Sequence, residues 1–390
     1  MFHLNTHIDF EKVAKNVDAA FIQNFLLKTK NINPPDDFFW PDYSDLFVPP
    51  RNQMLCGCCW AIAATDAISD TFVINKLVDF QPTVSATMAM ICHPQGQCLG
   101  GNPAVLLQDI SEGGVLSNRC LDYSWCSSTS CNGDSIHHFG QDFSQFLPSM
   151  CGCLFAKNEH LMYKINPNIF SLSVDNLGLD ECRRMTKMQI LKFGIPIAGF
   201  IVLKNFMSGD FSKTNGVYLE RVNYDRGGFI TVTESDVSGS HAVTVIGWGT
   251  QHDVVIDEHG TISSVPFWFC RNSWGTSWGE GGYFKMAMYP FNEISQFEKR
   301  VRFAGFRCGG FVIFNVSEPP RLVKTRQQTQ FPKHVVQPVD FYSTEHLDPK
   351  NESNDMYSTS ATNMSLIILI VLLIFVVHHL VVVGVLHSQG

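Results

Sequence analysis

The sequence predicts an α+β fold in which a cleft separates a helical subdomain from a β-rich subdomain, with one transmembrane helix added at the C-terminal end. Apolar residues recur at helical spacing in the first half of the chain, chiefly within residues 11–28 and 55–76. Beyond Leu191 the pattern changes to short runs of β-branched and aromatic residues bounded by Gly, Asn and Asp. Residues 364–386 form an apolar stretch long enough to cross a bilayer.

Composition restricts the class of protein. With 390 residues, 45 % apolar and only 16 % charged, the chain can bury a sizeable core, so disorder throughout is excluded. The 28 Lys and Arg residues are outnumbered by 36 Asp and Glu residues, which gives a formal net charge of −8. Phosphate contacts supply most of the affinity for nucleic acid, so this acidic balance and the lack of a basic cluster exclude nucleic acid as a partner.

The N-terminal part of the chain is expected to be helical. Residues 11–28 place apolar side chains on one face of an amphipathic helix, and residues 31–52, rich in Pro, Asp and aromatics, predict an extended connector. Residues 55–76 form a helix whose alanines favour close packing, so we expect it at the centre of its subdomain. Charged residues at positions 9, 11 and 12 interrupt the apolar core that a cleavable signal peptide needs, so none is expected.

The middle of the chain combines loops with the β-rich subdomain. Residues 92–155 are rich in Gly, Ser, Asn and Cys, which predicts loops. The expected strands lie within residues 195–203, 228–233, 241–249 and 266–272.

The C-terminal part divides into a stalk and an anchor. Residues 316–363 are polar and contain five prolines, which predicts a flexible stalk. Residues 364–386 supply the roughly 20 apolar residues that a transmembrane helix needs, and residues 387–390 form a short tail. The chain is therefore expected to be a single-pass membrane protein with a C-terminal anchor.

The side of the membrane stays open. The missing signal peptide and the short tail favour a domain that faces the cytosol, as in a tail-anchored protein, whereas the many cysteines favour an oxidising compartment. Glycosylation sequons at Asn315, Asn351 and Asn363 would be used only on the lumenal side.

Cysteine is concentrated in one part of the chain. Of the 13 cysteines, ten lie between Cys56 and Cys153. This density predicts disulfides, and the odd total leaves at least one thiol free. A free thiol here is a candidate for the functional cysteine.

The strongest chemical signal is the run of residues 52–60, NQMLCGCCW. This run resembles the nucleophile motif of papain-family cysteine peptidases, and the resemblance places Cys59 at the nucleophile position. A helix that starts at Cys59 would supply a positive potential that favours the thiolate over the thiol. By the same resemblance, the side chain of Gln53 and the backbone N–H of Cys59 form the oxyanion hole.

Two further motifs complete the resemblance in the family's order. Residues 239–243, GSHAV, offer His241 as the base, and residues 271–275, RNSWG, resemble the family's Asn-Ser-Trp-Gly signature. The resemblance implies that Asn272 orients the His241 ring and that Trp274 shields their hydrogen bond from water. Each residue alone has an ordinary structural explanation, whereas three ordered motifs point to a common function.

Within this family the sequence is most similar to cathepsin B-type peptidases. Residues 113–123, GGVLSNRCLDY, resemble their segment in which a cysteine is followed shortly by a tyrosine, and Gly100 and Gly101 match the glycine pair that lines their substrate cleft. His137 and His138 resemble the paired histidines of an occluding loop that binds a substrate's C-terminal carboxylate. No second cysteine follows these histidines closely, so an exposed polar loop is the alternative interpretation.

The resemblance also implies how the cysteines pair. The expected disulfides join Cys56 with Cys98, and Cys92 and Cys120 with Cys151 and Cys153. Cys58 stands where the family usually has serine or alanine, and it is either free or bonded to its neighbour Cys59.

These motifs divide the chain into an N-terminal segment, residues 1–40, that is a possible propeptide, and a peptidase domain, residues 41–315. Insertions at residues 121–155 and at an extended hairpin over residues 251–266 account for the wide spacing of the motifs. The implied activity is hydrolysis of protein or peptide substrates through a Cys59 thiolate, a histidine imidazolium and a thioester acyl-enzyme, which needs no metal or organic cofactor. The alternative is a catalytically silent papain-like domain that binds other molecules at a membrane.

Overall fold

The computed structural model describes residues 14–92, 95, 97–120, 122–123, 159–223, 228–229, 233–288 and 310–324. The chain divides into two units, residues 1–334 and 335–390, and every described residue lies in the first. The predicted anchor at residues 364–386 and the paired histidines of the predicted occluding loop lie outside the described residues. Within the described ranges, no helix is both long and apolar enough to cross a membrane.

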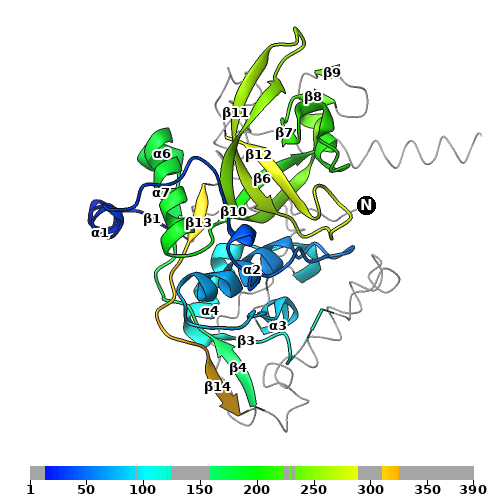
Figure 1. The fold of residues 1–390 in the computed structure, drawn as a ribbon. Coiled ribbons are helices and arrows are strands. Elements are labelled where there is room, and N and C mark those ends of the chain that lie inside the picture. The colour runs from blue at the N-terminus through cyan, green and yellow to red at the C-terminus, as the bar shows by residue number, and fades with distance from the viewer. Residues whose placement is uncertain are drawn as a thin grey trace, which may run out of the picture. The chain divides into compact units, whose positions relative to one another are not determined.

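The described helices fall into those that pack against α2 and those that pack against the large sheet. The α-helices are α1 (Ala19–Thr29), α2 (Cys59–Ile74), α3 (Ala86–Cys92), α4 (Pro103–Gly113), α6 (Val174–Leu177) and α7 (Leu179–Lys192). The short 3-10 helices are Trp40–Asp42, Gln97–Leu99, Lys204–Phe206, Ser212–Thr214 and Glu234–Asp236. The helices α3 and α4 pack against α2, whereas α6 and α7 lie beside the large sheet (Figure 1).

The described strands form one large sheet and two small ones. The strands of the large sheet are β1 (Lys15–Asn16), β2 (Phe38–Phe39), β5 (Phe170–Leu172), β6 (Ile197–Leu203), β7 (Val217–Tyr218), β10 (Val237–Val255), β11 (Ile262–Arg271), β12 (Tyr283–Ala287) and β13 (Phe311–Ile313). Their order is β1-β5-β13-β6-β10-β11-β12-β7, and β2 pairs with β10. The small sheets contain β14 (Arg321–Lys324), β4 (Glu159–Tyr163) and β3 (Val115–Leu116), and β8 (Val222–Asn223) with β9 (Gly228–Phe229).

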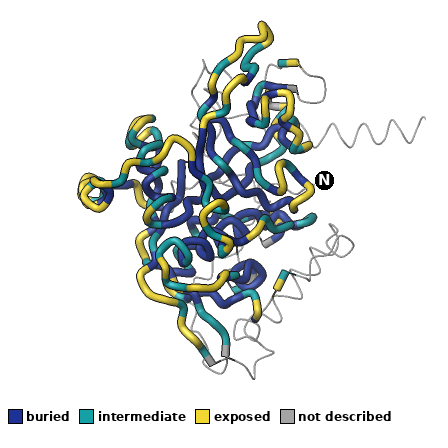
Figure 2. The backbone as a smooth tube through the Cα atoms, viewed as in Figure 1, coloured by how far each residue is buried: buried dark blue, intermediate teal, exposed yellow. Residues whose placement is uncertain are grey.

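The central position predicted for α2 is confirmed. All residues of this helix from Cys59 to Phe72 are buried, and Figure 2 shows it in the interior of the described domain. Small side chains such as Ala61 and Ala64 let α2 approach α4 on one side and the long strand β10 on another. The helix begins at Cys59 rather than at residue 55, because the preceding loop is held by a disulfide and by hydrogen bonds of Gln53.

The N-terminal helix is shorter than its periodicity predicts. It begins at Ala19, where the carboxylate of Asp18 caps it by accepting a hydrogen bond from the backbone N–H of Phe21. Lys15 and Asn16 instead pair in parallel with β5, which adds a strand to the edge of the large sheet. The prediction of a helix from residue 11 is therefore wrong over residues 14–18.

The helices α3 and α4 lie partly or wholly in a region for which the sequence predicts loops, and α4 is the larger difference. Asn102 caps α4 by accepting from the backbone N–H of Ala104, and Pro103 occupies the first helical position. The side chains of Leu106, Leu107 and Ile110, which belong to α4, are buried. The many Gly, Ser and Cys residues around α4 obscure this apolar pattern in the sequence.

The extended hairpin predicted over residues 251–266 is confirmed. The strands β10 and β11 pair in antiparallel register from Thr244 and Arg271 out to Val255 and Ile262. The inner part of β10 also pairs with β6, so it lies within the sheet while the hairpin tip extends into solvent (Figure 2). The insertion therefore lengthens both strands at the end that lies away from His241 and Asn272.

The ordered domain continues beyond the boundary that the sequence predicts at residue 315. Residues 321–324 form β14, which pairs in antiparallel register with β4. The predicted stalk therefore begins with a strand that belongs to the domain, and its residues beyond 324 lie outside the described part of the chain.

Candidate active site

Cys59 stands at the first position of α2, behind a tightly held loop. A disulfide joins Cys56 to Cys98, as predicted, and the backbone N–H of Gly57 donates to the Cys98 carbonyl at 2.8 Å. Cys58 is a free thiol, which decides between the two alternatives left by the sequence. Cys92 and Cys120 are also disulfide-bonded, while their expected partners lie outside the described residues. The loop thus delivers Cys59 to the positive end of a buried helix.

The side chains of His241 and Asn272 form a hydrogen-bonded pair on neighbouring strands. The Nε2 atom of His241 lies 2.7 Å from Oδ1 of Asn272, which directly follows β11. The backbone N–H of Ser273 also donates to this Oδ1 atom, at 2.8 Å. Because a backbone N–H can only donate, it fixes the orientation of the Asn272 amide, and Nε2 of His241 must then carry the ring proton.

The other ring nitrogen of His241 remains available for the cysteine. Among the described residues, Nδ1 of His241 has no hydrogen-bond partner. The backbone N–H of the next residue, Ala242, hydrogen-bonds the sulfur of Cys59. The start of α2 at Cys59 therefore meets β10 at Ala242, the residue that follows the predicted base His241.

Aromatic rings cover the bond between His241 and Asn272. The ring centroid of Trp274 lies 4.9 Å from that of His241, and the Phe200 ring approaches edge-on at 6.0 Å. Trp274 itself packs against Phe206 and Trp278 and is 2 % exposed. This packing agrees with the shielding role expected for Trp274.

Burial opposes ionisation of both catalytic groups. Cys59 and His241 are each 0 % exposed. Burial raises the pKa of the Cys59 thiol to about 11, although the N–H of Ala242 favours the thiolate, and it lowers the pKa of His241 to about 4, although Asn272 favours the imidazolium. Burial therefore disfavours the thiolate that the helix N-terminus predicts. Water or substrate that enters the site reduces this desolvation, and proton transfer from Cys59 to His241 creates an ion pair whose two charges stabilise each other.

Gln53, the predicted side chain of the oxyanion hole, is held through its side chain and its backbone. Its Nε2 donates to the Cys56 carbonyl at 2.9 Å, and its Oε1 accepts from the Ser273 hydroxyl at 2.6 Å. Its backbone N–H donates to the Ser273 carbonyl at 2.7 Å. These contacts hold Gln53 next to Cys56, and its role in an oxyanion hole stays a prediction.

The predicted glycine pair lies beside the residue that follows the nucleophile. A Cβ atom on Gly101 would lie 2.5 Å from the Trp60 ring, so only glycine fits there without a shift. Gly100 has a φ of 122°, a conformation that favours glycine. Packing against Trp60 is thus a sufficient physical reason for Gly101, and the role of both glycines in the substrate cleft stays a prediction.

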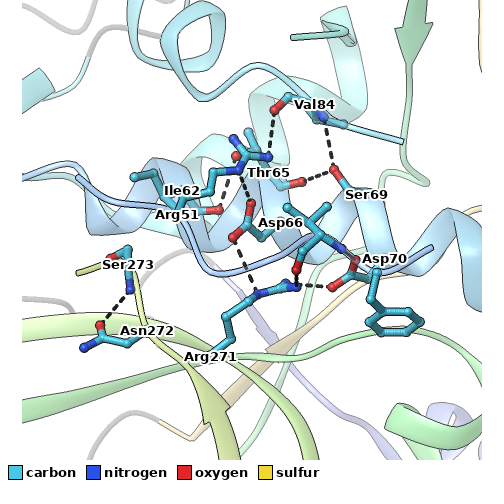
Figure 3. A network of polar contacts seen from close by, with 12 residues as sticks. Arg51, Ile62, Thr65, Asp66, Ser69, Asp70, Val84, Arg271, Asn272 and Ser273 are labelled. Atoms are coloured by element: carbon cyan, nitrogen blue, oxygen red, sulfur yellow. Dashed lines mark hydrogen bonds and ion pairs between the residues drawn. The ribbon is translucent and has the colours of Figure 1, made fainter. Parts of the chain in front are cut away.

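Buried ion pairs connect the helix of Cys59 with the strand that leads to Asn272 (Figure 3). Arg271 lies 2.7 Å from Asp70 and 3.6 Å from Asp66, both on α2, and Arg51 lies 2.8 Å from Asp66. Burial raises the pKa of Asp70 to about 6 in spite of Arg271. Because Arg271 precedes Asn272, this network fixes the asparagine relative to the helix that carries the nucleophile.

This network was not predicted from the sequence, nor were the hydrogen bonds of Ser273 to the side chains of Gln53 and Asn272. One signal was present: Asp66 and Asp70 are four residues apart in a helix of otherwise small and apolar residues, which places two charges on one buried face. No comparable local signal identifies Ser273 as a partner of Gln53, because the two are separated by 220 residues.

A cysteine at the start of a buried central helix, joined to a histidine and asparagine pair on an adjoining sheet, is the arrangement of a papain-type cysteine peptidase. A sequence profile described as papain family cysteine protease matches residues 34–149 and 211–300 of the chain. The protein belongs to this family and is a cysteine peptidase.

Individual relatives support this assignment. The chain is 40 % identical to a probable cysteine proteinase, 024R, of Invertebrate iridescent virus 3, over 83 % of this chain and 69 % of the relative. It is 41 % identical to a probable cysteine proteinase, 224L, of Invertebrate iridescent virus 6, over 82 % of this chain and 78 % of the relative. Among solved structures, the fold is similar to procathepsin B S9 from Trypanosoma congolense, with a TM-score of 0.54 and 19 % identity over 82 % of this chain and 87 % of that one.

Proposed function

We propose that this peptidase cleaves peptide bonds with Cys59 as nucleophile, His241 as base and acid, and Asn272 as the group that orients the histidine. The observation that carries the proposal is the fixed Asn272 amide, which leaves Nδ1 of His241 as the proton acceptor next to the strand residue that contacts the Cys59 sulfur. No other described cysteine combines the start of a helix with such a histidine.

The reaction follows from these positions. Nδ1 of His241 takes the thiol proton, and the sulfur of Cys59 attacks the substrate carbonyl. The side-chain amide of Gln53 and the backbone N–H of Cys59 stabilise the oxyanion. His241 then protonates the leaving amine, and water hydrolyses the thioester.

Replacement of single thiols tests the catalytic assignment. The Cys59→Ser variant should lose peptide hydrolysis and keep its fold, because one small polar atom replaces another. Cys182→Ser is the matched control: it also removes a free buried thiol, its sulfur bonds only weakly to the Leu172 carbonyl at 3.7 Å, and hydrolysis should persist. A folded native chain without hydrolysis would favour the catalytically silent domain, and equal hydrolysis by both variants would contradict Cys59 as the nucleophile.

We also propose that residues 364–386 anchor the peptidase in a membrane, with the residues from 325 to 363 as a stalk. Support comes from the length and hydrophobicity of this segment. The full chain should stay with membranes in alkaline carbonate, and a chain that ends at His334 should be released. Retention of the shortened chain, or release of the full one, contradicts the anchor, and protease protection of sealed vesicles identifies the side on which the peptidase lies.

A further inference from the structure

Two free thiols follow one another in the chain at the start of α2. Cys59 is the proposed nucleophile, and Cys58 directly precedes it. Both residues are 0 % exposed, and the sulfur of Cys58 lies 2.9 Å from the hydroxyl oxygen of Tyr123. The hydrolysis mechanism uses Cys59 alone, which leaves the neighbouring thiol of Cys58 without an assigned role.

The surroundings of the two thiols decide which sulfur reacts first. Nδ1 of His241 has no hydrogen-bond partner among the described residues, and the backbone N–H of the next residue, Ala242, hydrogen-bonds the sulfur of Cys59. Burial raises the pKa of Cys58 to about 12, although the Tyr123 hydroxyl favours its thiolate, and a negative charge on Cys59 raises this pKa further. Because oxidants attack the thiolate, Cys59 reacts first while Cys58 keeps its proton.

We propose that Cys58 is a resolving thiol, which converts oxidised Cys59 into a reversible disulfide between the two residues; this inference rests on the proposed function of Cys59. The oxidant is hydrogen peroxide. First, the Cys59 sulfur bonds to one peroxide oxygen, the O–O bond breaks, and the leaving hydroxide takes the thiol proton from His241 to form water. The Cys58 sulfur then attacks the sulfenic sulfur, the S–O bond breaks, and hydroxide leaves as water with the Cys58 proton. Two thiols thus lose two electrons to the peroxide.

The adjacent positions make this disulfide both accessible and easy to reduce. The Cα atoms of neighbouring residues lie about 3.8 Å apart across a trans peptide, so the two sulfurs can meet without movement of separate elements. Most disulfides join Cα atoms that are roughly 4.4–6.8 Å apart, so this one is strained and therefore easily reduced. Closure also strains the first turn of α2, where the Cys58 carbonyl accepts from the backbone N–H groups of Ala61 and Ile62 at 3.0 and 3.1 Å. The pair thus protects Cys59 from irreversible oxidation to the sulfinic acid.

Differential alkylation of the full chain tests the pairing. After treatment with hydrogen peroxide, the remaining thiols are blocked with iodoacetamide in denaturant, disulfides are reduced, and the released thiols receive isotopically heavy iodoacetamide. Cys56 and Cys98 should carry the heavy label with or without peroxide, because they are already bonded to each other. Peroxide should add equal heavy label to Cys58 and Cys59 in a chain that stays monomeric on a non-reducing gel. Dithiothreitol should restore hydrolysis to within about twofold of its starting value.

The Cys58→Ser variant removes the resolving thiol. After the same treatment its Cys59 should carry a sulfinic acid, which dithiothreitol does not reduce, so hydrolysis should return to less than about a tenth of the variant's own starting value. Cys182→Ser is the matched control, because it also removes a free buried thiol and should recover like the native chain.

Two results would overturn the proposal. The first is a native chain whose peroxide-treated Cys59 carries a sulfinic acid or pairs with a cysteine other than Cys58. The second is equal recovery of the native chain and Cys58→Ser. If that variant does not fold, the label on the native chain still decides. Hydrolysis by the reduced native chain tests the proposed function separately, because the heavy label reports the pairing even in a chain without hydrolysis.

Discussion

Two side-chain amides determine what the residues of the site can do. Asn272 presents its oxygen to His241 because the Ser273 N–H occupies the same atom, so the ring keeps one tautomer. The Gln53 side chain accepts from the Ser273 hydroxyl through its oxygen and donates to the Cys56 carbonyl through its nitrogen. Ser273 therefore fixes both amides, one through its backbone and one through its hydroxyl.

The histidine gives the free energy of unfolding a defined pH dependence. The pKa of His241 is about 4 in the folded chain, whereas an unfolded histidine titrates near about 6.5. Between these values the unfolded chain binds more protons, so stability decreases as the pH falls from about 6.5 towards 4. Urea unfolding at pH 6.5 and 4.5 should show that the native chain loses roughly 2–3 kcal/mol more than His241→Gln.

The comparison with His241→Gln removes the contribution of other groups to the pH dependence of the free energy of unfolding. Asp70, with a pKa raised to about 6, contributes the opposite slope, because its folded form binds more protons below that pH. This contribution is present in both chains and cancels in their difference. If the resting enzyme held an imidazolium paired with a thiolate, the pKa of His241 would be raised and the difference would change sign, which would contradict the neutral closed site.

The close contact between Gly101 and Trp60 predicts that a methyl group added at residue 101 lowers the free energy of unfolding. Gly101→Ala should lower the free energy of unfolding by about 1–3 kcal/mol, because its Cβ would overlap the indole that adjoins Cys59. Gly228→Ala is the control, since a Cβ there meets no atom within 4 Å, and its effect should stay within about 0.5 kcal/mol. Thermal or urea unfolding measures both, and equal stability of the two variants would contradict the packing.

The candidate catalytic residues are predictable because each belongs to a short motif whose chemistry is local. Cys59, His241 and Asn272 are each marked by their immediate neighbours in the sequence. The contacts that hold Gln53 are not predictable in this way, because Tyr123 and Ser273 reach it only through the folded chain. The burial of Cys59, which opposes the predicted thiolate, is likewise a property of the whole fold.

At the scale of elements, the described part of the N-terminal segment packs against the large sheet. Figure 1 shows α1 and β1 at one edge of this sheet, where the Phe21 ring lies 4.2 Å from Phe170 and the Phe25 ring 5.1 Å from Phe193. Phe170 belongs to β5 and Phe193 follows α7, whereas the candidate catalytic residues belong to α2, β10 and the end of β11. Residues 14–29 therefore contribute packing at the sheet edge.

Two substitutions in α1 test this placement. Phe25 is 5 % exposed, so Phe25→Ala should lower the free energy of unfolding by about 3–5 kcal/mol, whereas Leu27→Ala, at a position 61 % exposed, should have little effect. The kcat/KM of the folded enzyme should be the same for both variants. An increase of kcat/KM in Phe25→Ala would instead show that α1 acts as an inhibitory propeptide.

Elements with a clear period were predictable, and those set by long-range pairing were not. The buried helix α2 and the hairpin of β10 and β11 follow from apolar patterns in the sequence. The strands β1 and β14 are short and polar, and only their partners β5 and β4 define them. The helix α4 was overlooked because its cap and its buried leucines lie in a Gly- and Cys-rich region.

At the scale of the whole molecule, the proposed mechanism needs two groups of elements. The helix α2 carries Cys59, and the strands β10 and β11 bring His241 and Asn272 together. Buried ion pairs of Arg271 with Asp66 and Asp70 join these groups. Loss of one partner would leave a buried charge without compensation, which is strongly destabilising.

The central claim is that Cys59 is a nucleophile activated by His241. An epoxide inhibitor of papain-type enzymes, followed by peptide mapping, tests this claim most directly, because it identifies the reacting thiol. We predict a single adduct on Cys59 and none on Cys58, Cys182 and Cys270, the other free thiols of the described residues. The adduct should be lost in a folded His241→Ala variant. An adduct on another cysteine, or labelling of Cys59 that does not depend on His241, would contradict the account.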